Sequence, residues 1–569
     1  MESIQASYSN SSLESAFSGI PMDWHSIDWR RVNRNVREMQ IKMVKFYRES
    51  NWRKVKAMQR SLTRSFSGRC LAVRRVTENQ GKRTAGIDGE LWNTPETKWL
   101  AISKLKQQHG YKPKPLRRVY IPKSNGKKRP LSIPTMTDRA MQALYLLALE
   151  PIAESKADHN SYGFRQGRST ADAMGQLFIS LSKKLSAEWV LEADIKGCFD
   201  NISHQWLINN VPMNKLILTK WLKSGVVLKG QFFSEETGTP QGGIISPILA
   251  NLALNDLETG LHTYLGERFG KSRLRKLKVN IIRYADDFVI TGASKELLED
   301  TIVPWVTQFL SQRGLELSKE KTRVTHTSDG FDFLGWNFRR YSGKLLIKPS
   351  KKNAQALYAK LKEVVKTNMT MKQEVLIHLL NPILKGWANY HSPVVAKQTF
   401  SRLDNLLWYC LWRWAKRRHP TKSKTWVYEK YWHRLNDREV FSAPVKQPDG
   451  KTSYLSLYRL ADTVIKRHVK IKGEYNPFDP EWESYGEKRR NDRLMNNIKH
   501  IRKRVNLWYE QDGLCALCRL PLTEESGWQI HHVIHRVAGG PDTMDNLVLL
   551  HPNCHAQLHS KSLTVGKMV

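Results

Sequence analysis

The sequence predicts a multidomain protein that combines helices and strands, an α/β (α+β) architecture. Its 569 residues exceed what one hydrophobic core supports and suggest three or four domains. Short strand-like stretches rich in β-branched and aromatic residues alternate with longer stretches in which apolar residues recur at helical spacing. A cluster of Cys and His near the C-terminus indicates a further small module built around a metal.

The charge balance points to a polyanionic partner. Lys and Arg total 92 against 53 Asp and Glu, which gives a formal net charge of +39. An aromatic content of 10%, with 19 Trp, favours nucleic acid over a surface that is basic only for solubility, since solubility rarely needs so large an imbalance.

The sequence does not favour a membrane or secreted protein. No apolar run reaches the roughly 18 residues of a membrane span, and the longest, over residues 143–153, is interrupted by Glu150 and Pro151. Residues 1–23 are Ser-rich, lack a signal pattern and are predicted to be a disordered leader. Three of the six cysteines cluster near the end, which favours a reduced compartment and a metal over a disulfide framework.

The N-terminal part is predicted to be helical. Residues 24–74 carry apolar side chains at helical spacing among Arg and Lys, which predicts amphipathic helices with a basic outer face suited to RNA. The glycine-punctuated residues 81–89 are predicted to form a loop.

Two strand-like pieces follow and flank an Asn125-Gly126 turn, which is a strong hairpin signal. Lys123 and Arg129 lie on opposite arms near its tip, where both can reach one anion, and a triphosphate is the best candidate. A solvated basic hairpin is the alternative. An apolar helix over residues 140–149 is expected next.

Three aspartates stand out. Residues 190–194 predict a buried strand that ends at Asp194, and residues 281–291 predict two short strands joined by Asp286 and Asp287. Carboxylates on an apolar hairpin repel each other and persist most easily around a cation. With Asp194 they supply the three carboxylates that a two-metal site requires. An ordinary solvated Asp-Asp turn is the alternative.

The flanking segments are less specific. Residues 238–247 form a glycine turn that opens an apolar helix and lets the backbone approach a substrate closely. Residues 311–325 predict a helix followed by a strand, on which Lys321 either approaches phosphate or is an ordinary surface lysine. The aromatic helix at residues 406–414 stops at His419-Pro420, and its rings serve either the core or base stacking.

The C-terminal cluster has metal-ligand spacing. Cys515 with Cys518, and His551 with Cys554, form two pairs that suit a tetrahedral structural Zn²⁺ site. His531-His532, Asn546, His555 and His559 accompany them, and His555 and His559 would share one face of a helix. A zinc ribbon that only binds DNA is the alternative, but it would leave His531 and His532 idle.

Several ordered blocks carry a family resemblance. Lys123 and Arg129, Asp194 with Phe199, Thr239-Pro240-Gln241-Gly242 and Tyr284-Ala285-Asp286-Asp287 together resemble the fingers and palm of reverse transcriptases. Three further blocks, with residues 238–247, look like bacterial group II intron-encoded proteins: Gly163-Phe164-Arg165, Phe333-Leu334-Gly335-Trp336 and residues 381–390. The resemblance covers about residues 25–569.

The resemblance implies a right-hand polymerase followed by smaller domains. The implied order is a leader over residues 1–23, an N-terminal helical RNA-binding extension with fingers over 24–115, reverse transcriptase fingers and palm over 116–345, an α-helical thumb or maturase (maturase X) domain over 346–420, a basic DNA-binding region over 421–490 and a zinc-containing ββα HNH endonuclease domain over 491–569. A flexible tether over 421–490 is the alternative to a DNA-binding region.

The resemblance also implies roles for the polymerase residues. Asp194, Asp286 and Asp287 would hold two Mg²⁺ ions, and Lys123 and Arg129 would hold the nucleotide triphosphate. Phe199 would lie beneath the sugar and exclude a 2′-hydroxyl, while Gln241 would line the primer and nucleotide pocket.

The C-terminal histidines resemble the HNH nuclease pattern. By that resemblance His532 is the general base that activates water, and Asn546 orients the loop. His531, His555 and His559 would bind the catalytic divalent metal. His551 is a departure, since many relatives have Cys there, but imidazole is a sound zinc ligand.

The implied function is RNA-directed DNA polymerase, intron RNA splicing maturase and HNH DNA endonuclease, which nicks the target strand to prime reverse transcription during retrohoming. The implied partners are group II intron RNA, target DNA, template-primer and dNTPs, with no membrane, as a monomer or homodimer in the bacterial cytoplasm or nucleoid. The alternative is a splicing-only RNA-binding maturase with vestigial polymerase and nuclease. The intact carboxylates, Gln241 and the metal set disfavour it.

Overall fold

The computed structural model describes residues 23–569 apart from 107–109, 123–125, 127, 240–241, 436, 447–451, 499–501, 524–525, 535–539, 542, 561–562 and 567–569. Apart from Asp23, the predicted leader lies outside the described residues, as do Lys123, Asn125 and Gln241. The chain divides into two compact units: the first comprises Met1–Ala157, Gly197–Asn255 and Glu474–Val569, and the second comprises Asp158–Lys196 and Asp256–Gly473.

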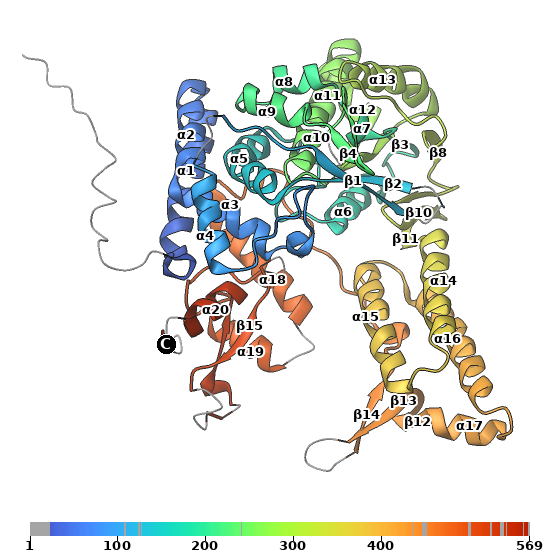
Figure 1. Ribbon diagram of the computed structural model, residues 1–569. Coiled ribbons are helices and arrows are strands. Elements are labelled where there is room, and N and C mark those ends of the chain that lie inside the picture. Colours follow the sequence, from blue (N-terminus) through green and yellow to red (C-terminus); the bar gives the residue numbers. More distant parts are fainter. Residues whose placement is uncertain are drawn as a thin grey trace, which may run out of the picture. The chain divides into compact units, whose positions relative to one another are not determined.

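The first unit opens with packed helices (Figure 1). After η2 (Trp24–Ser26) come α1 (Trp29–Arg48), α2 (Trp52–Arg64) and α3 (Phe66–Glu78), which confirms the helical prediction for residues 24–74. The side chains of Asp28, Asn51 and Ser65 cap their N-termini by accepting backbone N–H bonds. These helices pack on α5 (Met136–Lys156), which is longer than the predicted 140–149.

A four-stranded sheet in the order β2-β1-β4-β5 completes the fingers-like part of the first unit. Its strands are β1 (Leu116–Pro122), β2 (Lys128–Ile133), β4 (Val226–Leu228) and β5 (Gln231–Phe233). β1 and β2 are antiparallel, with Ile121 opposite Arg129, so the predicted hairpin pairing is confirmed. The remaining helices before residue 255 are η3 (Gln80–Arg83), α4 (Pro95–Lys104), α7 (Cys198–Asn201), α8 (His204–Asn210), α9 (Lys215–Leu222) and α10 (Ser246–Leu254).

The C-terminal part of the first unit contains a small module centred on two strands and the helix that follows them. β15 (Gln529–His532) and β16 (Leu547–Leu550) are antiparallel and are followed by α20 (Pro552–Ser560). The elements η7 (Pro480–Trp482), α18 (Glu483–Ile498), α19 (Arg502–Glu510) and η9 (Met544–Asn546) complete it.

The second unit is built on an antiparallel sheet in the order β6-β7-β3-β8. Its strands are β3 (Trp189–Asp194), β6 (Asn280–Tyr284), β7 (Asp287–Gly292) and β8 (Arg323–His326). β7 lies between β6 and β3, and all of its side chains except that of Asp287 are buried. The accompanying helices are α6 (Thr170–Leu181), α11 (Leu257–Phe269), η4 (Lys271–Arg273), α12 (Leu274–Leu277), η5 (Leu297–Ile302) and α13 (Val303–Ser311).

The helix predicted from residue 311 is wrong, because α13 ends at Ser311. Gly314 has a φ of +73°, and Leu315 donates its N–H to the Leu310 carbonyl 3.0 Å away, an arrangement that closes a helix C-terminus. Residues 316–318 then run beside β3, where Ser318 N–H donates to the Asp194 carbonyl at 2.8 Å.

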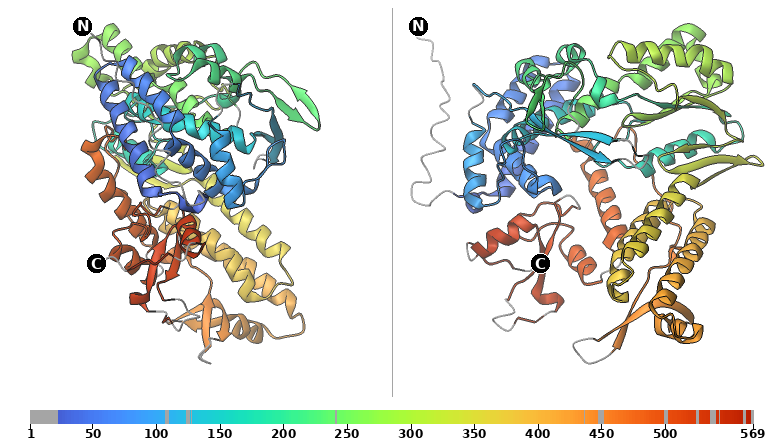
Figure 2. Two further views of the ribbon diagram at one scale, coloured as in Figure 1. Left: turned by 60° about the vertical axis from the view of Figure 1, so that its left-hand side comes forward. Right: turned by 45° about the vertical axis from the view of Figure 1, so that its right-hand side comes forward.

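The rest of the second unit is helical with small sheets. A sheet of β9 (Phe331–Phe333), β10 (Trp336–Tyr341) and β11 (Lys344–Pro349) precedes α14 (Lys351–Thr367), α15 (Gln373–His391) and α16 (Lys397–Arg418), which pack side by side (Figure 2). The dense aromatic helix ends before His419-Pro420, as predicted. The aromatic side chains of this helix differ in burial, since Trp414 is buried and Tyr409 is exposed.

The described parts of residues 424–456 form a helix and a small sheet, which a flexible tether would not contain. α17 (Lys424–Tyr431) leads into a three-stranded sheet of β12 (Trp432–Leu435), β13 (Arg438–Lys446) and β14 (Thr452–Ser456), followed by η6 (Leu460–Asp462). In the part of the chain that the structure describes, no helix has the length and apolar character needed to cross a membrane, and none of the six cysteines forms a disulfide bond.

Candidate active sites

The hairpin between β6 and β7 carries the aspartate pair, although the turn differs from the prediction. Tyr284 pairs with Asp287, so the connecting residues are Ala285 and Asp286, and Asp287 is the first residue of β7. The prediction that both aspartates form the turn is therefore wrong by one residue. Ala285 takes the left-handed position with a φ of +59°, which sharp two-residue turns require and which is costly for a residue with a Cβ atom.

A neighbouring loop supports this strained turn. The Tyr162 N–H donates to the Arg283 carbonyl at 2.9 Å, and the Arg283 N–H donates to the Asn160 carbonyl at 3.0 Å. A Cβ atom on Gly163 would overlap the Ala285 amide nitrogen, so only glycine fits there. Gly163 thus has a structural role that the family motif alone did not explain.

The three predicted carboxylates come together in the second unit. Asp194, the last residue of β3, lies directly opposite Asp287 in the antiparallel register, a position where Cβ atoms are about 5 Å apart. Burial, together with the charges of Asp286 and Asp194, raises the pKa of Asp287 to about 7. Asp287 therefore keeps its proton into the neutral pH range, and a bound cation would favour its ionised form.

Lys321 is a further member of this group. Its Nζ lies 2.8 Å from Asp194 Oδ2, and this hydrogen bond raises the pKa of Lys321. The sequence left Lys321 as either a phosphate contact or a surface lysine, because its partner depends on residues 316–318 running beside β3. In the structure it pairs with a carboxylate.

Two of the four predicted nucleotide-binding residues, Arg129 and Phe199, are described and lie in the first unit. Arg129 is exposed on β2, and Phe199 is half-buried in α7 just after Gly197, which has a φ of +55°. The backbone at Gly238 and Thr239 packs directly against α7. The Thr239 N–H donates to the Phe199 carbonyl, and a Cβ atom on Gly238 would overlap the Asp200 backbone. Lys123 and Gln241 lie outside the described residues.

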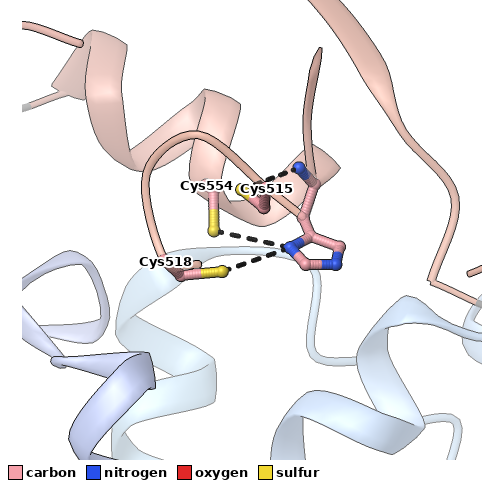
Figure 3. A group of neighbouring side chains, drawn as sticks. Cys515, Cys518 and Cys554 are labelled. Atoms are coloured by element: carbon pink, nitrogen blue, oxygen red, sulfur yellow. Dashed lines mark hydrogen bonds between the residues drawn. The ribbon is translucent and has the colours of Figure 1, made fainter. Parts of the chain in front are cut away.

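The predicted zinc ligands form one buried group (Figure 3). His551 Nδ1 lies 3.3 Å from Cys518 Sγ and 3.9 Å from Cys554 Sγ, and all four ligand atoms lie within 4.8 Å of one another. A tetrahedral zinc with bonds of about 2.3 Å to sulfur and 2.0 Å to nitrogen sets ligand atoms roughly 3.5–3.8 Å apart. The spacing of the side chains therefore fits this ion.

The surroundings of the group also fit a metal. His551 Nε2 lies 3.1 Å from the Pro521 carbonyl, an arrangement that leaves Nδ1 as the ligand atom. Hydrogen bonds from Cys518 and Cys554 lower the pKa of Cys515, whereas hydrogen bonds with Cys515 and Cys518 raise the pKa of Cys554. Burial lowers the pKa of His551, but bonds to Cys515 and Cys518 raise it to about 9. Cys515, His551 and Cys554 thus share protons among them, and a divalent cation would displace those protons.

A second cluster lies in the same module. His531 of β15 and His555 and His559 of α20 place one ring nitrogen each within 4.8 Å of the others. His531 is buried and His559 is exposed, so the cluster is open on one side, as a catalytic metal site needs.

Asn546 and His532 flank this cluster in different ways. Asn546 is buried, and its side chain accepts from the Ile534 N–H at 2.7 Å and donates to the Ile534 and Pro541 carbonyls at 3.0 and 2.8 Å. It therefore fastens the loop after β15. His532, the last residue of that strand, is half-buried next to His531.

Comparisons with known families match these parts in order. The family described as reverse transcriptase (RNA-dependent DNA polymerase) matches residues 121–338, and the N-terminal domain of reverse transcriptase matches 24–105. The group II intron, maturase-specific domain matches residues 354–432, and HNH endonuclease matches 515–561.

Individual relatives agree with these matches. Protein YkfC of Escherichia coli is 35% identical, over 46% of this chain and 78% of its own length. The group II intron-encoded protein LtrA of Lactococcus lactis is 33% identical over 48% of this chain, and the alignment spans only 55% of LtrA. A telomerase structure from Candida albicans aligns over 58% of this chain and 71% of its own chain, with 14% sequence identity. The TM-score of 0.32 is too low to support an inference.

The order of the matched domains, the opposed carboxylates, the Cys/His group and the three-histidine cluster lead to one assignment. The chain belongs to the reverse transcriptase family of group II intron-encoded proteins.

Proposed function

We propose that this protein copies RNA into DNA, assists the splicing of a group II intron RNA and nicks target DNA to provide the primer. The observation that carries the polymerase part is the placement of Asp194 opposite Asp287, one residue from Asp286. The net charge of +39 and the matched maturase domain support intron RNA, template-primer and target DNA as partners.

The polymerase chemistry is phosphoryl transfer. Two Mg²⁺ ions held by Asp194, Asp286 and Asp287 would supply the charge that activates a primer 3′-oxygen and stabilises the leaving pyrophosphate. Lys123 and Arg129 hold the triphosphate, Phe199 excludes a 2′-hydroxyl, and Gln241 lines the primer and nucleotide pocket. Before substrate binds, the ammonium group of Lys321 places a positive charge beside the Asp194 carboxylate.

The nuclease chemistry belongs to the C-terminal module. Cys515, Cys518, His551 and Cys554 hold a structural Zn²⁺, and His531, His555 and His559 hold the catalytic divalent metal. His532 takes a proton from the attacking water, while Asn546 keeps the loop after β15 in place. The folded segment from α17 to β14 contributes to DNA binding.

Primer extension on an RNA template tests the polymerase assignment. We expect Asp286→Asn to abolish DNA synthesis and to leave RNA binding within about twofold, because a neutral amide cannot replace a metal-binding carboxylate. The matched control is Asp332→Asn, since Asp332 lies on β9 and accepts a bond from the Asn337 amide that an altered side chain can replace. Synthesis by Asp286→Asn would contradict the assignment, and splicing without synthesis by the wild type would favour a splicing-only maturase.

A further inference from the structure

The helix that bears Cys554 is fastened to the N-terminal helices. Asn553 Oδ1 accepts a hydrogen bond from the Trp24 indole at 2.8 Å, and the Gln557 amide donates to the His25 carbonyl at 2.6 Å. Both partners on the N-terminal side come from η2 or its end. One turn of α20 therefore joins the nuclease module to residues more than 500 positions earlier in the chain.

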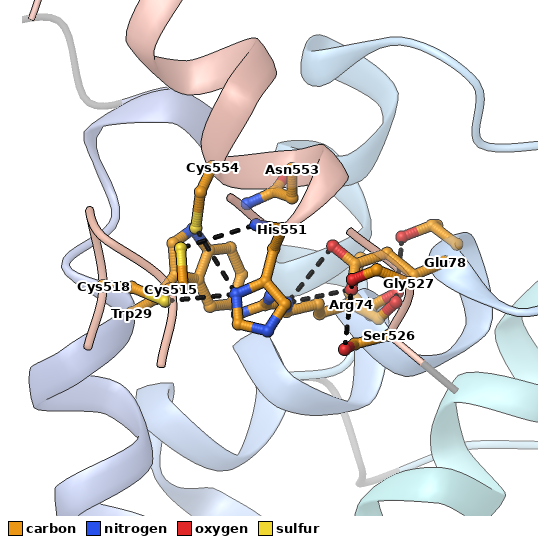
Figure 4. A network of polar contacts seen from close by, with 12 residues as sticks. Trp29, Arg74, Glu78, Cys515, Cys518, Ser526, Gly527, His551, Asn553 and Cys554 are labelled. Carbon is orange, nitrogen blue, oxygen red and sulfur yellow. Dashed lines mark hydrogen bonds and ion pairs between the residues drawn. The ribbon is translucent and has the colours of Figure 1, made fainter. Parts of the chain in front are cut away.

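Aromatic rings and an arginine fill the space beneath this contact. Trp24 and Trp29 are almost fully buried and meet edge to face, with ring centroids 4.9 Å apart. The Arg74 guanidinium lies 4.8 Å from the Trp29 ring, and only 8% of Arg74 is exposed. Figure 4 shows Trp29 and Arg74 beside the Cys/His group.

Arg74 is paired with Glu78 at 3.0 Å and lies beside a metal group that would itself be negatively charged. Three thiolates, a neutral imidazole and Zn²⁺ together carry one net negative charge. Burial lowers the pKa of Arg74, but the charges of Glu78, Cys554 and Cys518 outweigh it and raise that pKa. Both hydrogen bonds from Arg74 to Glu78 use Nε, at 3.2 and 3.0 Å.

We propose that Arg74 of the N-terminal helices is the buried counter-charge of the structural metal group, so that metal binding and docking of the nuclease module stabilise each other. The inference rests on the zinc assignment made under the proposed function. By thermodynamic reciprocity, a metal that strengthens docking is itself bound more tightly when the module is docked.

A purely mechanical attachment is the competing explanation. The bonds between η2 and α20 would then hold the module whether or not a metal is present, and the Arg74 charge would not affect the metal. The two explanations differ in what happens to the metal when Arg74 is neutralised.

The test measures zinc release from the full-length protein into a chromogenic chelator, after zinc content has been determined by mass spectrometry. We expect Arg74→Met to release zinc roughly tenfold faster than the wild type, which corresponds to about 1.4 kcal/mol. Arg75→Met is the matched control, because Arg75 is the next residue of α3 and pairs instead with Glu150 at 3.8 Å. We expect it to release zinc at the wild-type rate.

Hydrogen exchange supplies a second readout that does not depend on any one variant folding. Removing zinc from the wild type with a chelator should increase exchange over Trp24–Ser26 as well as over α20. Trp24→Phe keeps an aromatic side chain but deletes the indole donor, and it should accelerate zinc release although Trp24 lies outside the metal group.

The outcomes separate the two levels of the argument. Zinc present with release unchanged in Arg74→Met and Trp24→Phe, and exchange at η2 unchanged on removal, would overturn the coupling and leave the zinc site standing. A purified protein that binds no zinc would overturn both the coupling and the proposed zinc site. Primer extension should persist in every variant, because none touches the carboxylates.

Discussion

Asp194 and Asp287 lie directly opposite each other on adjacent antiparallel strands, and Lys321 forms an ion pair with Asp194. Like charges in opposed positions destabilise a sheet. The sheet therefore stores a repulsion that a bound cation would remove, and this relationship leads to the first prediction.

Asp287→Asn should abolish DNA synthesis and stabilise the protein when no divalent metal is present. The pKa of Asp287 is raised to about 7, so the folded protein holds a proton that the unfolded chain releases near pH 4. The destabilisation is absent below pH 4, grows as pH rises and is complete above pH 7.

Because Asp287 is partly exposed to solvent, which screens its charge, we expect a gain of about 1 kcal/mol at pH 8 and none at pH 4. Thermal unfolding in EDTA at both pH values measures it, with Asp332→Asn as the control. An equal effect of Asp287→Asn at the two pH values would contradict the electrostatic origin.

Gly163→Ala should damage the polymerase without touching a carboxylate. The new methyl group would overlap the Ala285 amide and push the turn that carries Asp286 out of place. Overpacking of this kind typically costs about 1–3 kcal/mol. Urea unfolding and primer extension together measure the effect.

Gly386→Ala is the stability control for this substitution, because a Cβ atom on Gly386 meets nothing within 4 Å in helix α15. It should leave the free energy of unfolding unchanged or increase it by up to about 1 kcal/mol. A Gly163→Ala protein with wild-type stability and synthesis would show that the loop at Gly163 does not position the turn.

Two substitutions in the nuclease module should separate chemistry from structure. His532→Ala should stop DNA nicking while the melting temperature and metal content stay at wild-type values. Asn546→Ala should instead destabilise the module by about 1–3 kcal/mol, because it removes three buried hydrogen bonds to the loop after β15. Nicking assays and thermal unfolding on both proteins measure the difference, and nicking by His532→Ala would remove its role as the base.

Cys518→Ser should remove the structural metal and with it the fold of the nuclease module. Cys518 Sγ lies 3.3 Å from His551 Nδ1, and a hydroxyl is a poor zinc ligand. Zinc content and nicking should both fall to background, while primer extension continues, since the carboxylates belong to the other unit. Loss of primer extension in this variant would show that the polymerase depends on the module.

The sequence predicted which side chains lie together better than it predicted their local geometry. Asp194 and the 286/287 pair stand out because carboxylates on apolar strands need a partner. The predicted zinc ligands stand out because the two-residue spacing within each pair is visible in the sequence itself. The identity of the turn residues depended on strand register, which a shift of one residue changes and which no local pattern determined.

Long-range partners could not be predicted from local patterns. Lys321 meets Asp194 because of how residues 316–318 run, and Trp24 meets Asn553 through packing across 529 positions of sequence. In the sequence Arg74 resembles any other basic residue of an amphipathic helix, but in the structure it is buried. Such contacts arise from tertiary packing, which periodicity does not encode.

The hydrogen bond between Trp24 and Asn553 also concerns synthesis on the ribosome. The Trp24 indole precedes its acceptor Asn553 by 529 positions, so it leaves the exit tunnel long before this partner has been synthesised. A product that stops before α20 would therefore leave the Trp24 indole without the acceptor that Asn553 supplies.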